Sequence, residues 1–186
     1  ECCKNLEYQG FTVSYLKPEV DGLIDIEKLK NALRKDTILV SVSHINNEIG
    51  VIQDIEKIAE IVAEHGALTH VDGAQTIGKE EINLKDSKIA MMSFSAHKCH
   101  GPKGVGALYL RDNPKIHLKP ICYGGAQEQK LRPGTIASQQ IIGMASAFDI
   151  ATKELAKNSQ HIEELAALLR QGIMSIPGTT VNGSLE

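Results

Sequence analysis

Short apolar runs alternate with amphipathic stretches of helical period along most of this chain. Apolar side chains recur every three or four residues from Ile26 to Leu33 and from Ile55 to Val62, as in helices that bury one face. Four other runs have the length and apolar content of strands: 37–42, 67–71, 89–94 and 105–110. Because strands and helices alternate, the sequence predicts a layered domain of the α/β class.

The ends of two helices can be predicted. Asp54 is a suitable N-cap and Gly66 a suitable stop for the clearest helix. Asp25 is expected to cap the helix before it in the same way. Between these helices, the run Ile38-Leu39-Val40 is continuous and apolar, which predicts a strand covered on both faces.

Further expectations concern the less regular parts of the chain. Residues 1–10 are interpreted as the last turns of a helix, and 11–16 as an alternating strand. The connection from 94 to 105 is too short for a crossover helix, so the strands that it joins are expected to be antiparallel or non-adjacent. Helix is expected from 137 to about 175, with a break at 157–159.

Charge and hydropathy argue against several classes of protein. The 186 residues carry 20 basic and 23 acidic side chains, mixed without a basic run, which argues against binding of nucleic acid or of a membrane surface. No apolar stretch approaches the roughly 20 residues of a membrane-spanning helix. The four cysteines include no CxxC pair and are interpreted as reduced thiols of a cytosolic protein.

Histidine and cysteine side chains gather near position 100. His97, Cys99 and His100 are close in sequence, and Cys122 follows at a distance. Sulfur and imidazole are zinc ligands. However, neighbouring residues on an extended segment point to opposite sides, and the spacing matches no standard pattern. No metal site is therefore predicted.

Polar residues follow the predicted strands at the points where the strands end. Asp72 comes directly after 67–71, and Lys98 follows 89–94 just before a glycine-rich turn. In open α/β sheets, ligands bind beyond the carboxyl ends of the strands. A desolvated carboxylate there needs a cation, and a desolvated lysine is a candidate amine nucleophile. Taken singly, such residues are more often a helix cap or a solvated charge.

The combination of residues indicates a pyridoxal phosphate site. An amine nucleophile, a carboxylate and Ser, His or Thr donors suited to a phosphate are the groups that such a site requires. The carboxylate of Asp72 would keep the pyridine nitrogen protonated, so that the ring accepts the electrons released at the substrate α-carbon.

Four motifs resemble those of the cysteine desulfurases, in the class V aminotransferase group of fold-type I pyridoxal phosphate enzymes. They are His44-Ile45-Asn46-Asn47-Glu48-Ile49-Gly50, His70-Val71-Asp72-Gly73-Ala74-Gln75, Ser93-Phe94-Ser95-Ala96-His97-Lys98 and Arg132-Pro133-Gly134-Thr135. The resemblance implies a three-layer α-β-α large domain with a mostly parallel sheet, incomplete at both ends. Residues 1–155 would belong to this cofactor-binding domain, and 156–186 would be the helical connection to, and the start of, a small C-terminal domain.

The resemblance also implies roles for residues around the cofactor ring. Lys98 is expected to form the internal aldimine with pyridoxal 5'-phosphate and to be the catalytic residue. Asp72 is expected to pair with the pyridine nitrogen. Asn47 and Gln75 would hold the phenolic oxygen of the cofactor or the substrate region.

A second set of implied roles concerns the cofactor phosphate. Ser95 and His97 are expected to bind it within the same subunit. In the family, the residue that matches Thr135 reaches the phosphate from the neighbouring subunit. The resemblance therefore implies a homodimer with a shared site.

The implied activity is pyridoxal phosphate-dependent cysteine desulfuration. L-cysteine would become L-alanine, and the sulfur would pass on as a persulfide to an acceptor scaffold protein for iron-sulfur cluster assembly or to tRNA thiolation. The expected location is the cytoplasm, or the mitochondrion in a eukaryote. Direct binding of nucleic acid and attachment to a membrane are not expected.

Two departures from the family pattern leave other interpretations open. The family's N-terminal phosphate-binding turn and ring-stacking histidine are expected before Glu1, and its catalytic cysteine beyond Glu186, because none of the four cysteines here corresponds to it. The 186-residue segment alone is therefore expected to be inactive, as the central piece of a longer enzyme. The alternatives are a truncated non-catalytic remnant, a related class V aminotransferase and a selenocysteine lyase.

Overall fold

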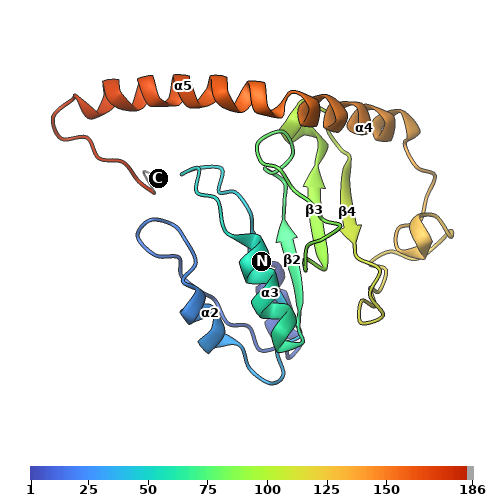
Figure 1. Ribbon diagram of the computed structural model, residues 1–186. Coiled ribbons are helices and arrows are strands. Elements are labelled where there is room, and N and C mark those ends of the chain that lie inside the picture. The colour runs from blue at the N-terminus through green and yellow to red at the C-terminus, as the bar shows by residue number, and fades with distance from the viewer. Residues whose placement is uncertain (184–186) are drawn as a thin grey trace.

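The computed structural model describes residues 1–183 and has the predicted α/β architecture (Figure 1). Its elements are α1 (Cys2–Tyr8), α2 (Ile26–Ala32), β1 (Leu39–Ser43), α3 (Ile55–His65), β2 (Leu68–Asp72), β3 (Met91–Ser95), the 3-10 turn η1 (Ala96–Cys99), β4 (Gly106–Leu110), the 3-10 turn η2 (Glu128–Lys130), α4 (Ser138–Lys153) and α5 (Leu155–Met174). Within residues 1–183, no helix combines the length and apolar character needed to cross a membrane. The end of the predicted 156–186 segment, including Glu186, lies outside the described residues.

The four strands form one mixed sheet in the order β1-β2-β3-β4. β1 and β2 are parallel, with Leu39 opposite Leu68 and Ser43 opposite Asp72, and β2 and β3 are also parallel. β4 returns antiparallel to β3, as expected from the short connection. The arrowheads of β2 and β3 in Figure 1 therefore point to the same end of the sheet. The predicted mostly parallel sheet is confirmed.

The hydrophobic core lies between the helices α2 and α3 and one face of the sheet. A first buried cluster joins α3 to the strands and consists of Ile55, Ala59, Val71, Ile89 and Met92. A second joins α2 to α3 and consists of Leu29, Ile58, Val62 and Ala67. Full burial of a large apolar side chain contributes roughly 1.5–3 kcal/mol. These two clusters therefore hold both helices on the same face.

Toward the carboxyl ends of its strands, the opposite face of the sheet carries polar side chains. Because paired residues of parallel strands point the same way, Ser41, His70 and Asp72 share this face with Ser93. Ser41 Oγ and His70 Nδ1 are 2.9 Å apart. Burial lowers the pKa of His70, and the Asp72 carboxylate acts in the other direction. Asp72, which is predicted to pair with the pyridine nitrogen of the cofactor, therefore lies on the face away from the core.

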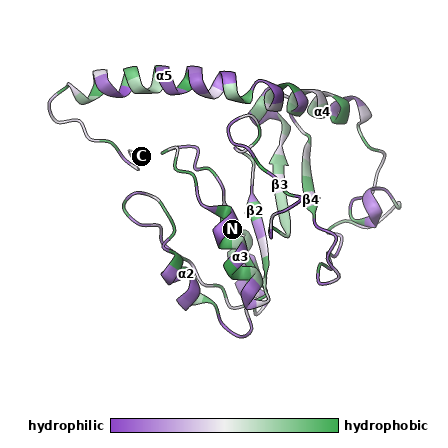
Figure 2. Cartoon of the chain, in the orientation of Figure 1, coloured by the Kyte–Doolittle hydropathy of each residue, from purple (hydrophilic) through white to green (hydrophobic). Residues whose placement is uncertain are grey.

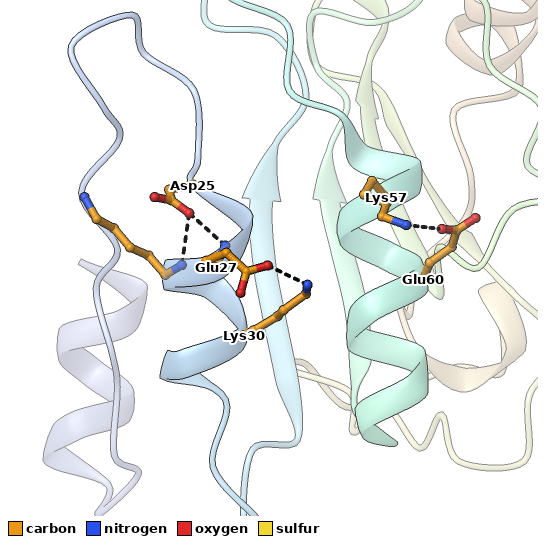
Figure 3. Close-up of polar contacts among 6 residues, drawn as sticks. Asp25, Glu27, Lys30, Lys57 and Glu60 are labelled. Atoms are coloured by element: carbon orange, nitrogen blue, oxygen red, sulfur yellow. Dashed lines mark hydrogen bonds and ion pairs between the residues drawn. The ribbon is translucent and has the colours of Figure 1, made fainter.

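Both helices of the core layer begin at a capping aspartate, as predicted. Asp25 Oδ1 accepts hydrogen bonds from the backbone N–H groups of Glu27 at 2.7 Å and Lys28 at 3.1 Å (Figure 3). The Asp54 side chain caps α3 by accepting a hydrogen bond from the backbone N–H of Lys57, and Gly66 ends that helix at φ 91°. Figure 3 also shows two exposed ion pairs, which contribute about 0–1 kcal/mol each: Glu27–Lys30 and Lys57–Glu60.

Helix α4 packs against the turn that follows β3. The Phe148 ring of α4 meets the Phe94 ring of β3 edge-on, with centroids 6.1 Å apart. Gly101 lies so close to the helix that an added Cβ would come within 3.2 Å of the Ala147 Cβ. Figure 1 shows α4 at the arrowhead end of β3. The helix therefore fixes the position of η1 at the end of the sheet.

Two of the predicted strand features are wrong. Residues 11–16 form no strand. Instead, Leu16 packs against the α2–α3 cluster. This apolar side chain of the segment therefore contacts helices and not a neighbouring strand. β1 is not covered on both faces, and Ile38 beside it is 65% exposed. The reason is that β1 is an edge strand of the described sheet.

The predicted break in the C-terminal helical region is displaced. The helices α4 and α5 meet at the non-helical Glu154, whereas Lys157 and Asn158 lie inside α5 and are exposed. A helix tolerates polar residues on a solvent-facing side, so no break is needed there. No residue of α5 is buried, and its exposed side chains include Leu165 and Leu169. Figure 2 shows patches of hydrophobic colour along this helix.

A Gly106→Ala variant is expected to destabilise the sheet. An added Cβ would lie 2.5 Å from the Phe94 carbonyl oxygen on the neighbouring strand, so β3 and β4 would have to separate. Such overpacking costs about 1–3 kcal/mol, measurable as a lower midpoint of urea unfolding followed by circular dichroism. Gly172→Ala, in open space on α5, is the control and should not lower the midpoint. An unchanged midpoint for Gly106→Ala would contradict this packing.

Candidate active site

The carboxyl ends of β1, β2 and β3 meet at one edge of the sheet. Ser43 is opposite Asp72, and Asp72 is opposite Ser93. Backbone hydrogen bonds continue the alignment past the strands, because His44 N donates to Asp72 O at 3.0 Å and Gly73 N donates to Ser93 O at 2.9 Å. The connections after all three strands therefore begin side by side, where ligands bind in sheets of this kind.

Asp72 and Lys98 reach this edge from neighbouring strands. Asp72 ends β2, and Lys98 lies in η1, which begins directly after β3. Asp72 Oδ1 accepts a hydrogen bond from the backbone N–H of Ala74 at 3.0 Å. This bond orients the carboxylate, and a carboxylate has further capacity to accept at its second oxygen. The predicted amine and the predicted carboxylate thus lie at the same edge.

The turn η1 divides buried from exposed side chains. Ala96 and Cys99 are buried, His97 and Lys98 are exposed, and Ser95 before them is half-buried. The Cys99 thiol donates to the Ala96 carbonyl oxygen at 3.2 Å, and burial raises the pKa of this thiol. The buried residues anchor the turn, so that His97 and Lys98 face outward from it.

The sequence predicts that Asp72 and Lys98 are shielded from water. This prediction is wrong for the described part of the chain, where both side chains are exposed. Asp72 is on the sheet face opposite α3, and Lys98 is on the outer side of η1. The core described above therefore does not shield either charge. A ligand bound at this edge would shield both charges from water.

Gln75 lies half-buried in the turn after β2, where its Oε1 accepts a hydrogen bond from Lys79 Nζ at 2.8 Å. The next residue, Thr76, is fully buried, and its hydroxyl oxygen is 2.8 Å from Nδ1 of the buried His44. This contact ties the turn after β2 to the end of β1. The sequence-based prediction missed Lys79 and Thr76. Residues four apart can contact each other within a helical turn. The spacing of Gln75 and Lys79 could therefore have indicated their hydrogen bond.

Asn47 and Thr135 lie on separate loops. Asn47 is exposed in the turn after β1, which is held by Asn46 Oδ1 accepting two backbone hydrogen bonds. Thr135 is exposed in the connection between η2 and α4. The described part of the chain brings neither side chain into hydrogen-bond contact with Asp72 or Lys98, and their roles stay predictions.

A cavity of about 780 Å³ opens beside His44 on the α3 side of the strand ends. Its lining comes from the start of α3, from residues 77–87 and from the junction of α4 and α5, and it includes several acidic side chains. Neither Asp72 nor Lys98 lines it. The candidate site is therefore the open edge of the sheet and not this cavity.

Stability is expected to fall as the pH is lowered below about 6.5, in part because of His44. Burial lowers the pKa of this imidazole from its ordinary value of 6.5, so the unfolded chain binds a proton that the folded chain resists. The free energy of unfolding then decreases as the pH falls from 6.5 toward the folded-state pKa. Urea unfolding at pH 7.5 and pH 5.5 measures the difference.

A His44→Gln variant is expected to show a smaller loss of stability between these two pH values, whatever its stability at pH 7.5. His161→Gln is the matched control, because His161 is exposed on α5. An unchanged pH dependence in the His44 variant would show that another group is responsible.

The fold and the site together define a class of protein. A mostly parallel sheet carries helices on one face, and polar groups gather at the carboxyl ends of its strands. A lysine in the turn after β3 accompanies the carboxylate that ends β2. This is the α/β large domain of fold-type I enzymes. The chain belongs to the aminotransferase class-V family, whose family model matches residues 1–186.

Relatives and solved structures agree with this assignment. The chain is 47% identical over 186 residues to a protein named cysteine desulfurase IscS from Mannheimia succiniciproducens, and 49% identical to one of the same name from Haemophilus influenzae. In both comparisons all of this chain is matched, but only 46% of the relative. The chain thus spans about half the length of the curated relatives that it matches.

Solved structures show the same similarity in three dimensions. A structure titled "NIFS-LIKE PROTEIN" superposes with a TM-score of 0.92 at 39% identity, covering 97% of this chain and 49% of that one. A structure titled "SspA in complex with cysteine" has a TM-score of 0.75 at 43% identity, covering 80% of this chain and 43% of that one. The predicted family resemblance and fold class are confirmed.

Proposed function

We propose that the protein that carries this chain is a pyridoxal phosphate-dependent cysteine desulfurase. It converts L-cysteine to L-alanine and transfers the sulfur to an enzyme thiol, which becomes a persulfide. The sulfur then passes to an acceptor for iron-sulfur cluster assembly or tRNA thiolation. The supporting observation is the position of Asp72 and Lys98 at the same edge of the sheet, in a chain that is 47–49% identical throughout to proteins named cysteine desulfurase.

The residues at this edge fit the cofactor in their chemistry. Asp72 is an anion with one oxygen oriented by Ala74, which suits a protonated ring nitrogen. Ser95 and His97 supply hydroxyl and imidazole groups for a phosphate. When bound, pyridoxal phosphate withdraws the electrons released at the α-carbon of an amino acid. Asp72 favours that withdrawal by keeping a positive charge in the ring.

Lys98 would act through its amine nitrogen. Exposed in η1, Nζ is available as a nucleophile for a carbonyl carbon, and in its neutral form it accepts a proton from a carbon acid and returns it at a later step. The packing of Ala96 and Cys99 beneath the turn holds the backbone of this residue at the strand end. Gln75 and Asn47 would contact the phenolic oxygen of the ring or the substrate.

The proposal includes a homodimer with a shared site. Thr135 is exposed on a loop apart from the other candidate residues, as a residue that serves a neighbouring subunit would be. The sulfur acceptor would be a separate scaffold protein. Light scattering of the purified protein tests the dimer independently of the reaction.

Product analysis tests the proposed reaction. The purified protein that carries this chain is freed of bound cofactor and is then incubated with L-cysteine and a thiol reductant, with and without added pyridoxal phosphate. We expect L-alanine and sulfide in equal amounts, only in the sample with cofactor. Transfer of the amino group to a keto acid would instead indicate an aminotransferase, and release of selenide from selenocysteine with no reaction of cysteine would indicate a selenocysteine lyase. No product and no cofactor binding would indicate a non-catalytic remnant.

A further inference from the structure

Lys79 and Gln75 form a hydrogen-bonded pair in the turn after β2. Lys79 Nζ lies 2.8 Å from Gln75 Oε1. A lysine ammonium can only donate, so the end of the amide that it contacts must be the carbonyl oxygen. The ammonium therefore fixes an orientation that the similar shapes of the amide oxygen and nitrogen would otherwise leave open. The free end of Gln75 is its NH2 group, which is a donor.

The ammonium of Lys79 contacts the turn after β2 and is also influenced by charged groups of η1. Lys79 is exposed as a whole, but partial desolvation of its ammonium lowers its pKa; the charge of Lys98 acts in the same direction, whereas Cys99 acts in the opposite one. The groups of η1 therefore act on Lys79 electrostatically, while its hydrogen bond is to Gln75. Among the ion pairs of residues 1–183, none includes Lys79, so no carboxylate there draws it away from Gln75.

The backbone around this pair is fixed by other contacts. Thr76 is bonded to His44, and Lys79 N donates to Thr76 O at 3.0 Å. Gly78, at φ 76°, approaches α4 so closely that an added Cβ would lie 2.9 Å from the Ala151 Cβ. With the turn held in this way, the contact with Lys79 determines how the Gln75 amide is turned.

We propose that Lys79 is a positioning residue for the cofactor site: its ammonium holds the carbonyl end of Gln75 and so presents the amide nitrogen as a hydrogen-bond donor to the cofactor's phenolic oxygen. This inference rests on the proposed function. Lys79 itself touches neither cofactor nor substrate in this scheme. Without it, the Gln75 amide can rotate and present its oxygen, which repels a phenolate.

A double-mutant cycle tests the proposal. The dissociation constant of pyridoxal phosphate is measured by spectral titration for the wild type, Lys79→Met, Gln75→Leu and the double variant. We expect Lys79→Met to weaken cofactor binding about fivefold, the effect of one lost hydrogen bond, and to have no further effect in the Gln75→Leu background. Lys79→Arg, which keeps a donor, should restore most of the affinity. Lys85→Met, at an exposed lysine elsewhere, should bind as the wild type does.

A measurement on the cofactor-free protein tests the role of Lys79 separately from the proposed cysteine desulfurase function. The side-chain amide signal of Gln75 in a proton–nitrogen NMR spectrum, identified by its loss in Gln75→Leu, should shift in Lys79→Met and stay in place in Lys85→Met. An unshifted signal, or additive effects of the two substitutions on cofactor binding, would overturn the role of Lys79 while leaving the proposed function intact. A wild type that binds no pyridoxal phosphate would instead overturn the proposed function, and the role of Lys79 at the cofactor with it.

Discussion

A Lys98→Ala variant is expected to lose the visible absorption band of the bound cofactor and at least about 100- to 10,000-fold of its desulfurase activity, the range attributed to a positioned acid–base group alone. The substitution removes both the nucleophilic amine and the proton acceptor at the end of β3. It leaves the fold in place, because the side chain is exposed and the buried residues of η1 are Ala96 and Cys99. Absorption spectra and alanine production measure the two effects.

Lys103→Ala is the matched control for this prediction. Lys103 is an exposed lysine in the turn that follows η1, and its contact with α4 is made by its backbone carbonyl oxygen, which accepts from Gln140. The control variant should keep the band and the activity. A Lys98→Ala protein with the wild-type spectrum would eliminate Lys98 as the cofactor lysine, and with it the assignment of the site.

An Asp72→Asn variant is expected to lose roughly 150- to 5,000-fold in turnover, with a smaller change in cofactor affinity. The substitution keeps the shape and the acceptor oxygen that Ala74 contacts, but it removes the charge that would stabilise the protonated ring nitrogen. Loss of one member of an ion pair shielded from water costs about 3–5 kcal/mol, and each 1.36 kcal/mol is tenfold in rate. Steady-state kinetics at saturating cofactor measure the effect.

A Ser95→Ala variant should show the opposite balance. Its hydroxyl is expected to contact the phosphate, away from the reacting carbon, so cofactor affinity should fall about fivefold and turnover at saturating cofactor should change little. If Asp72→Asn weakened affinity more than turnover, or Ser95→Ala did the reverse, the assigned roles of the two residues would have to be exchanged or abandoned.

The sequence predicts the regular parts of this fold well, because their signals are local. The Asp25 and Asp54 caps, the Gly66 stop and the antiparallel return of β4 follow from neighbouring residues and from the length of a connection. The strand at 11–16 and the two-sided covering of β1 were predicted wrongly, because they depend on where a segment lies in the sheet. Apolar alternation alone does not distinguish a strand from a loop packed on helices.

In the candidate site, too, features with local sequence signals could be predicted and features that depend on the tertiary arrangement could not. The shared position of Asp72 and Lys98 at one edge could be predicted because each lies at the end of an apolar strand, and parallel strands bring their carboxyl ends together. Their exposure could not be predicted, because it depends on which face of the sheet the helices cover. The contacts of Thr76 with His44 and of Lys79 with Gln75 were missed, since they depend on the path of a turn without regular structure.

The last described residues return to the turn that carries Asn47. An added Cβ on Gly183 would lie 3.2 Å from the Ile49 carbonyl oxygen and 3.3 Å from Val51, although α5 separates this tail from the rest of the sheet in sequence. The segment that follows α5 therefore lies against the turn after β1, and a rotation of α5 about Glu154 would strain or break this contact.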